Sequence, residues 1–183
     1  LLEAAEALCM GGDPGRGGAR TGVFPLLAAA HKRLPKVAIA LLEARADPLQ
    51  VHHESGAFAL LSAAQDGFLD VVEVLLHGAA DPNQTNDRNG DFPLFAACRG
   101  SHADVASTLL SAAADPGKVC SQAPDFPLLV ASKMGCLSLV RLLLQAHADP
   151  QQVHPAGSPF ALLVAAQDGH LDVVLELLRA GAD

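Results

Sequence analysis

The chain has 183 residues, a formal net charge of −8 and a hydrophobic content of 50%. This acidic balance disfavours binding to nucleic acid and to anionic membrane surfaces, both of which attract basic proteins. The sequence has no apolar run of the ~18 residues that a membrane-spanning helix needs, so we expect no direct membrane insertion. Cys9, Cys98, Cys120 and Cys136 form no CxxC pair and match no zinc spacing. Their pattern predicts free thiols in an intracellular, cytoplasmic compartment, with a disulfide or metal site as the alternative.

Two sequence markers repeat with one period. Phenylalanine stands at positions 24, 58, 92, 126 and 160, a constant step of 34. The aspartate that closes each copy stands at positions 13, 47, 81, 115, 149 and 183, again a step of 34. A period that keeps its register over five copies indicates an array of stacked repeats.

Each copy predicts the same elements in chain order. A short apolar helix follows the phenylalanine, as in "PLLAAAHK", and a break comes next, usually with glycine. The second helix is longer, and in the copy "LDVVEVLLHGAAD" Val71, Val72 and Leu75 fall at helical spacing. A segment rich in Gly, Pro, Asn, Gln and His then predicts a turn or hairpin. The break glycines are Gly67, Gly100, Gly135 and Gly169.

The helix ends carry further signals. Asp70, Asp104 and Asp172 are expected in the first turn of their second helices, where a carboxylate meets the positive end of the helix dipole. Pro35 is expected at a helix start, where its missing N–H matters little. Helices this short are marginal alone, so each unit has to bury its apolar faces against its neighbours. The prediction is therefore an all-α solenoid of helix-turn-helix units.

These residues resemble the ankyrin repeat family over nearly the whole chain. "GDFPLFAACRGSHADVASTLLSAAADP" and "GHLDVVLELLRAGAD" are similar to its pattern of Gly-x-Thr-Pro-Leu-His-x-Ala-Ala, Gly-His-Leu-Glu-Val-Val and Leu-Leu-x-x-Gly-Ala-Asp. We expect one array over residues 1–183, beginning with the second helix of a partial repeat at 1–14. Full repeats are expected at 15–48, 49–82, 83–116, 117–150 and 151–183. Because both ends fall inside the pattern, we expect a piece of a longer protein or assembly.

The chain departs from the family pattern at four places. The period is 34 rather than 33, and the extra residue falls in the loop. Phenylalanine replaces the threonine that opens the first helix. Leucine or phenylalanine replaces the histidine of the same motif. Arg45, Ala79, Ala113 and His147 replace the glycine after the second helix, which only Gly181 keeps. Either these four residues adopt a left-handed cap, or the cap shifts, as Gly78 suggests.

The repeated phenylalanine poses a choice between core and surface. Losing a threonine cap costs about 1 kcal/mol, whereas burying a phenylalanine stabilises by about 1.5–3 kcal/mol. We therefore expect the rings between neighbouring units, with a row of exposed rings as the alternative docking strip. The expected repeat core consists of Phe24, Phe58, Phe92, Phe126, Phe160, Leu26, Leu60, Leu94, Leu128 and Leu162.

No catalytic constellation is recognisable. The chain has no phosphate-binding glycine loop, no GxSxG elbow, and no nucleophile at motif spacing from a base. His52, His53 and Glu54 form the only local histidine cluster, and two adjacent histidines do not make a metal site. We expect no enzyme activity, no metal and no cofactor.

Variable positions on a constant frame predict a recognition surface. The resemblance implies that partners are read by hairpin tips and by the exposed side of the short helices. The candidate binding residues are His52, His53, Glu54, Gln65, Asp66, Asn86, Asp87, Arg88, Arg99, Lys133, Gln167 and Asp168. Unconstrained solvent positions would show the same variation.

Charge is uneven along the array. Residues 49–82 hold five acids and no Lys or Arg, whereas residues 1–48 hold six Lys or Arg and five acids. This favours a protein partner with a basic patch. The leading hypothesis is a non-catalytic protein-binding module. The alternative is a structural spacer packed into a larger assembly.

Overall fold

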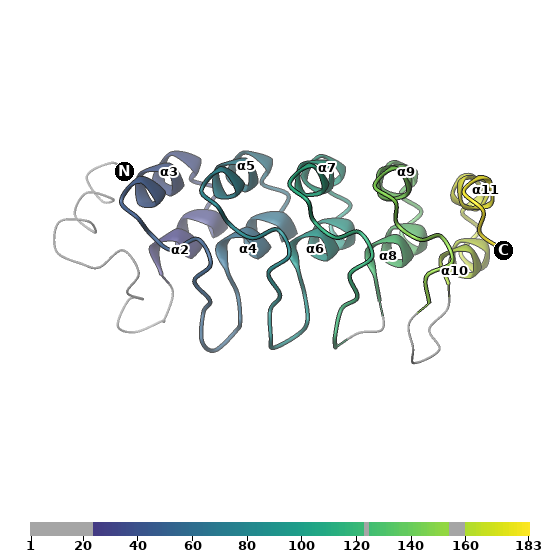
Figure 1. Ribbon diagram of the computed structural model, residues 1–183, viewed down its shortest axis with the longest axis horizontal. Coiled ribbons are helices and arrows are strands. Elements are labelled where there is room, and N and C mark those ends of the chain that lie inside the picture. Colours follow the sequence, from purple (N-terminus) through teal and green to yellow (C-terminus); the bar gives the residue numbers. More distant parts are fainter. Residues whose placement is uncertain (1–23, 123–124, 154–159) are drawn as a thin grey trace.

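The computed structural model describes residues 24–122, 125–153 and 160–183, which form helices in pairs and no strand (Figure 1). The first helix of each pair is the shorter one: α2 (Pro25–His31), α4 (Ala59–Gln65), α6 (Pro93–Arg99), α8 (Pro127–Lys133) and α10 (Ala161–Gln167). The second helices are α3 (Pro35–Glu43), α5 (Leu69–His77), α7 (Ala103–Ser111), α9 (Leu137–Gln145) and α11 (Leu171–Arg179). The expected all-α repeat fold is confirmed.

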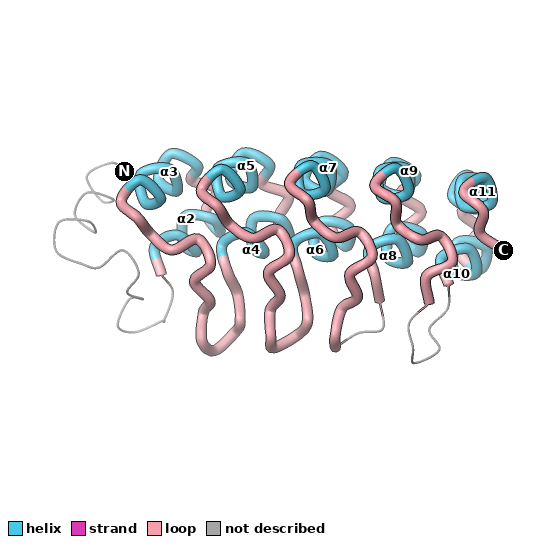
Figure 2. Tube along the Cα trace, viewed as in Figure 1, coloured by secondary structure: helices cyan, strands magenta, loops and turns pink. Residues whose placement is uncertain are grey.

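The pairs stack side by side in two layers. Each short helix packs against the short helix of the next pair, and the long helices pack in the same order. The loop from one pair to the next projects from the short-helix layer, away from the long helices (Figure 2). The expected partial repeat at residues 1–14 lies outside the described residues, and the unit boundaries remain a prediction.

The helices begin where the sequence analysis placed them. Pro35 opens α3, and Asp70, Asp104 and Asp172 lie in the first turns of α5, α7 and α11. The repeated phenylalanine is the N-cap residue of every short helix described. Its backbone is extended there, and its side chain forms no capping hydrogen bond.

Four of the five repeated rings lie in the core. Phe24, Phe58, Phe92 and Phe126 are at most 1% exposed. The leucines two positions later in the same units are equally buried. The alternative of an exposed docking strip is therefore wrong for these four rings.

The last unit differs from this expectation. Phe160 and Leu162 are only half-buried. The short helix α10 packs against α8 and α11, and no other described helix covers its far side. The core expected around the fifth phenylalanine is consequently incomplete.

The second helices end in left-handed residues at the predicted positions. The φ angles are 64° at Arg45, 66° at Ala79, 65° at Ala113, 66° at His147 and 91° at Gly181. The alternative of a shifted cap is wrong, since Gly78 has φ −79°. The break between helices also uses this conformation, but in the third unit the residue is Ser101 (φ 58°) rather than Gly100.

The projecting loops are hairpins closed by backbone hydrogen bonds. The His52 amide donates to the Ala57 carbonyl at 2.8 Å, and the Asn86 amide donates to the Asp91 carbonyl at 2.8 Å. In the next loop, 34 residues further on, the Cys120 amide donates to the Asp125 carbonyl at 3.0 Å. The closing hydrogen bonds of these three loops thus recur with the period of the sequence.

Candidate protein-binding surface

Two rows of predicted residues lie on the hairpin side of the molecule. One row follows the C-terminal ends of the short helices, and the other follows the hairpins (Figure 1). The positions of both rows recur from unit to unit because the sequence repeats every 34 residues. We call these two rows together the hairpin face.

The helix-end row is exposed as predicted. These residues lie at the C-terminal end of each short helix, where the chain turns toward the second helix. Their side chains point away from the core. The exposed candidates in this row are Gln65, Asp66, Arg99, Lys133, Gln167 and Asp168. Their chemistry changes from unit to unit although the backbone position does not.

Four hairpin candidates are also exposed. His53 and Glu54 lie at one tip with 3.7 Å between His53 Nε2 and Glu54 Oε1. Asp87 and Arg88 lie at the next tip, and Arg88 Nη2 donates to the His53 carbonyl at 2.7 Å. Neighbouring tips are thus joined by a side chain that also reaches solvent.

The other two hairpin candidates are buried. His52 is 8% exposed, and its Nδ1 lies 2.9 Å from the Ser55 hydroxyl. Asn86 is 3% exposed and donates from Nδ2 to the Ser55 carbonyl at 3.1 Å. Both residues close their hairpins, which turns their side chains inward. They are therefore structural residues rather than contact residues.

Gly56 shows how closely the hairpins approach each other. A Cβ at Gly56 would lie 1.9 Å from Asn86 Oδ1, and its φ of 71° also favours glycine. The amide of Asn86 therefore occupies space that only a glycine leaves open. The first and second described hairpins hold a fixed relative position as a result.

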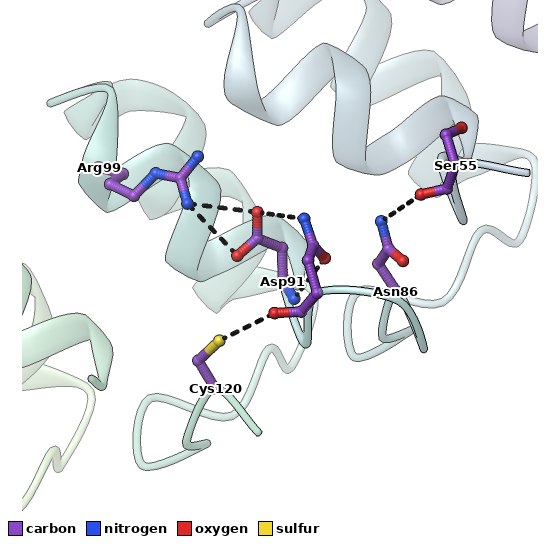
Figure 3. Close-up of polar contacts among 6 residues, drawn as sticks. Ser55, Asn86, Asp91, Arg99 and Cys120 are labelled. Atoms are coloured by element: carbon purple, nitrogen blue, oxygen red, sulfur yellow. Dashed lines mark hydrogen bonds and ion pairs between the residues drawn. The ribbon is translucent and has the colours of Figure 1, made fainter. Parts of the chain in front are cut away.

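A buried carboxylate anchors the third unit (Figure 3). Asp91 is 6% exposed and accepts hydrogen bonds from Asn89 Nδ2 at 3.0 Å and Arg99 Nη1 at 3.3 Å. Cys120 Sγ donates to the Asn89 carbonyl at 3.5 Å. Asp91 neutralises part of the charge of Arg99. Arg99 therefore attracts an acidic partner less strongly than the sequence suggested.

A ladder of side chains that sequence reasoning missed connects successive loops. Gln84 Nε2 donates to the Leu49 carbonyl at 2.8 Å, and Gln152 Nε2 donates to the Gly117 carbonyl at 2.7 Å. Lys118 Nζ donates to the Asn83 carbonyl in the same way. Each donor reaches 35 residues back. The sequence did contain a signal for these three donors, since positions 84, 118 and 152 follow the period of 34.

Cys98 is fully buried in the short helix α6. Burial raises the pKa of the Cys98 thiol to about 12, and repulsion from Cys136 acts in the same direction. Cys98 is therefore a protonated thiol at neutral pH and a poor nucleophile. Among the described residues no three His, Cys, Asp or Glu side chains gather as metal ligands.

The comparison with family models decides the family. The model described as "Ankyrin repeats (3 copies)" matches residues 26–120 and 60–154, which together span more than half of the chain. The chain belongs to the ankyrin repeat family. Ankyrin repeats generally act as protein–protein interaction modules, and ankyrin repeat proteins are typically non-enzymatic.

A search of curated proteins finds no match to this ankyrin array. In the described part of the chain, none of the ankyrin helices combines the length and hydrophobicity that crossing a membrane requires. The geometry of the hairpin face is therefore the main guide to what these repeats bind.

Proposed function

We propose that the hairpin face binds a protein partner without catalysing a reaction. The observation that carries this proposal is the contrast within each unit. Buried positions repeat as apolar residues, whereas the exposed helix-end position reads His31, Gln65, Arg99, Lys133 and Gln167. A rigid frame with changing exposed chemistry is suited to selective recognition.

The cross-unit contacts support this proposal. Hydrogen bonds from Gln84 and Gln152 and the Asn86–Ser55 contact hold neighbouring loops in fixed relative positions. A preorganised surface loses less conformational entropy when it binds. The hairpins can therefore present their tips as one continuous surface.

The acidic part of the hairpin face favours a partner with a basic patch. Of the five acids in residues 49–82, Glu54 and Asp66 are exposed candidates on this face. Asp70 contributes less, because its carboxylate lies 3.2 Å from Arg33 Nε. Glu54 and Asp66 are thus the residues whose charge a basic partner would meet.

A capture experiment with the 183-residue chain tests the proposal. Glu54→Lys with Asp66→Lys should abolish capture of the specific partner from cell extract, identified by comparison with the unaltered chain. The matched control is Asp104→Lys with Asp172→Lys, which changes net charge equally on exposed residues of the long helices. Identical capture by all three proteins would contradict the proposed surface.

Salt provides a second measurement on the captured partner. Affinity should fall as ionic strength rises, because exposed charge pairs are screened within about 10 Å at 0.1 M salt. An affinity independent of salt would remove the basic patch from the proposal and leave only the binding surface.

A structural spacer is the second candidate function, and one observation favours it. Leu171, Leu175 and Leu178 are 66%, 41% and 49% exposed and lie at helical spacing on α11. Such an apolar face suits packing into a larger assembly. If substitutions there remove all interactions while the charge reversals on the hairpin face have no effect, the spacer is the better description.

A further inference from the structure

Helices α3 and α5 are neighbours in the long-helix layer, the layer away from the hairpins (Figure 1). A groove lies between them. Its volume is about 500 Å³. Ile39 and Leu42 line it from α3, and Val74 and Gly78 line it from α5 and its C-cap. Ile39 is 43% exposed, so an aliphatic surface faces solvent here. The volume lies within the range of small ligand and side-chain pockets.

Gly78 keeps this groove open for a reason unrelated to its backbone. Its φ of −79° and ψ of 14° suit any residue. The same C-cap position holds alanine in the other four units, at Ala44, Ala112, Ala146 and Ala180. A Cβ at Gly78 would lie 2.5 Å from Leu42 Cδ1, so this side chain, which lines the groove, would have to move.

The rim of the groove carries two carboxylates without counter-ions. Glu43 and Glu73 are exposed, and neither forms an ion pair with another described residue. Arg33 is engaged by Asp70, and Lys36 lies in the first turn of α3, at the opposite end of the helix from Glu43. The groove, which His77 also lines, therefore combines an apolar floor with two carboxylates that form no ion pair among the described residues.

The groove between α9 and α11 has the opposite character at the same repeat positions. Arg141 stands where Ile39 stands in the first groove, and Glu176 stands where Val74 does. Arg141 Nε lies 3.1 Å from Glu176 Oε2, and Arg179 Nη1 lies 3.5 Å from the same oxygen. Its charges are paired internally. It is a natural control for the α3–α5 groove.

We propose that the α3–α5 groove binds a protein segment that presents one aliphatic side chain flanked by lysine or arginine. The aliphatic side chain would contact Ile39, Leu42 and Val74. The flanking cations would pair with Glu43 and Glu73. This site is separate from the hairpin face, so the chain can engage two segments at once.

Amide NMR shifts of the ¹⁵N-labelled 183-residue chain test this site directly. The probe is an acetylated and amidated peptide, Gly-Arg-Arg-Leu-Arg-Arg-Gly. Shifts are expected at the amides of Val74, His77 and Gly78, with weaker binding at higher salt. No saturable shift is expected at Arg179 and Ala180 in the control groove. Peptides with serine in place of leucine, or glutamate in place of arginine, should leave the groove amides unchanged.

Two variants separate the apolar and charged contributions. Gly78→Ala should weaken the peptide roughly tenfold by filling the groove, a change of about 1.4 kcal/mol. Glu43→Gln with Glu73→Gln should weaken it by a similar factor and remove the salt dependence. The matched control is Asp104→Asn with Asp172→Asn, exposed carboxylates of α7 and α11 outside the groove, which should leave this affinity unchanged.

Several results would overturn the proposal. They are an absence of shifts at millimolar peptide, equal shifts in the α9–α11 groove, or full affinity in a folded Gly78→Ala variant. Shifts of the Val74 and Gly78 amides on dilution of the protein alone would assign the groove to a second copy of the chain instead.

Discussion

The repeated phenylalanine replaces a polar pair by an apolar one. In the family pattern a threonine caps the short helix and a histidine follows in the same motif. Here the buried rings of the first four units are accompanied by Leu27, Leu61, Phe95 and Leu129 at the histidine position, all at most 4% exposed. Replacing both polar groups avoids leaving one of them buried without a partner, which would cost about 1–3 kcal/mol.

Phe92→Thr should lower the free energy of unfolding by about 3 kcal/mol, since the lost burial outweighs the regained cap. Urea denaturation followed by circular dichroism measures the change. Phe160→Thr is the matched control and should have a smaller effect, because that ring is only half-buried. An unchanged or raised stability of the Phe92 variant would contradict the conclusion that this ring stabilises the core.

Ser132 is a residue at which the chain carries a polar atom without a partner. It is fully buried in α8, and its hydroxyl forms no hydrogen bond. Alanine stands at the same position in three other units, at Ala30, Ala64 and Ala166. The hydroxyl is therefore dispensable for the fold.

Ser132→Ala should raise the free energy of unfolding by about 1 kcal/mol, because it removes an uncompensated desolvation cost. Thermal melting provides the measurement, and exposed Ser138→Ala is the control, with little expected change. A loss of stability on Ser132→Ala would indicate that the hydroxyl has a partner after all.

The raised pKa of Cys98 predicts how the stability of the protein changes at alkaline pH. Burial raises the pKa of its thiol from the ordinary value of 9.0 to about 12 in the folded chain. The unfolded state therefore loses its proton first as pH rises. This contribution to stability is present below about pH 9 and is lost toward pH 12, at up to about 1.4 kcal/mol per pH unit.

Cys98→Ala should flatten the pH dependence of unfolding between about pH 9 and 11, because alanine has no proton to lose. The chain has no tyrosine to contribute in this range. Urea midpoints at successive pH values measure the slope. A slope identical to that of the unaltered chain would assign the alkaline transition to other groups.

At the scale of single elements, the ends of the long helices store backbone strain. Four of the five left-handed cap residues are not glycine. A non-glycine residue in this conformation costs about 1–2 kcal/mol. The surrounding packing tolerates this because the next residue of each unit, such as Ala80 or Ala114, is buried against the stack.

Ala113→Gly should raise the free energy of unfolding by roughly 0.5–1 kcal/mol, because the relief of strain exceeds the added flexibility of the unfolded chain. The neighbouring substitution Ala112→Gly should have the opposite sign, since Ala112 has φ −87°. Paired denaturation curves compare the two. Equal effects from both would show that the cap conformation contributes nothing to stability.

On the scale of the whole molecule, stability depends on how many neighbours each unit has. The inner pairs pack against pairs on both sides, whereas α10 and α11 pack against described helices on one side only. Leu178 is 49% exposed, although its counterparts Leu76, Leu110 and Leu144 are partly buried against the core. A one-dimensional stack is expected to open first at a unit that packs against fewer neighbours.

Hydrogen exchange of the 183-residue chain should show this gradient. Amides of α10 and α11 are expected to exchange roughly tenfold or more faster than those of α6 and α7, because their local opening exposes fewer contacts. Mass spectrometry of peptic fragments resolves the two regions. Uniform protection along the array would mean that the chain unfolds only as one unit.

A repeating signal made the frame predictable. The period of 34 placed both helices of each unit and the phenylalanine at the start of the first helix, whereas the left-handed cap after the second helix was one of two alternatives that the structure decided. The ladder donors at Gln84, Lys118 and Gln152 carried the same period, and their role was missed because polar loop residues resemble solvent-exposed ones. The candidate site was less predictable. Most of its residues are exposed, but His52 and Asn86 are buried.

By itself, then, the sequence determined the all-α stack and the apolar seam, because these depend on features that recur at one spacing. Only the tertiary structure decided the rest. It paired Arg99 with Asp91, turned Asn86 toward the preceding hairpin, and opened a groove beside Gly78. The physical reason is that the exposure and charge of a side chain depend on residues one repeat away, whose geometry a linear period does not specify.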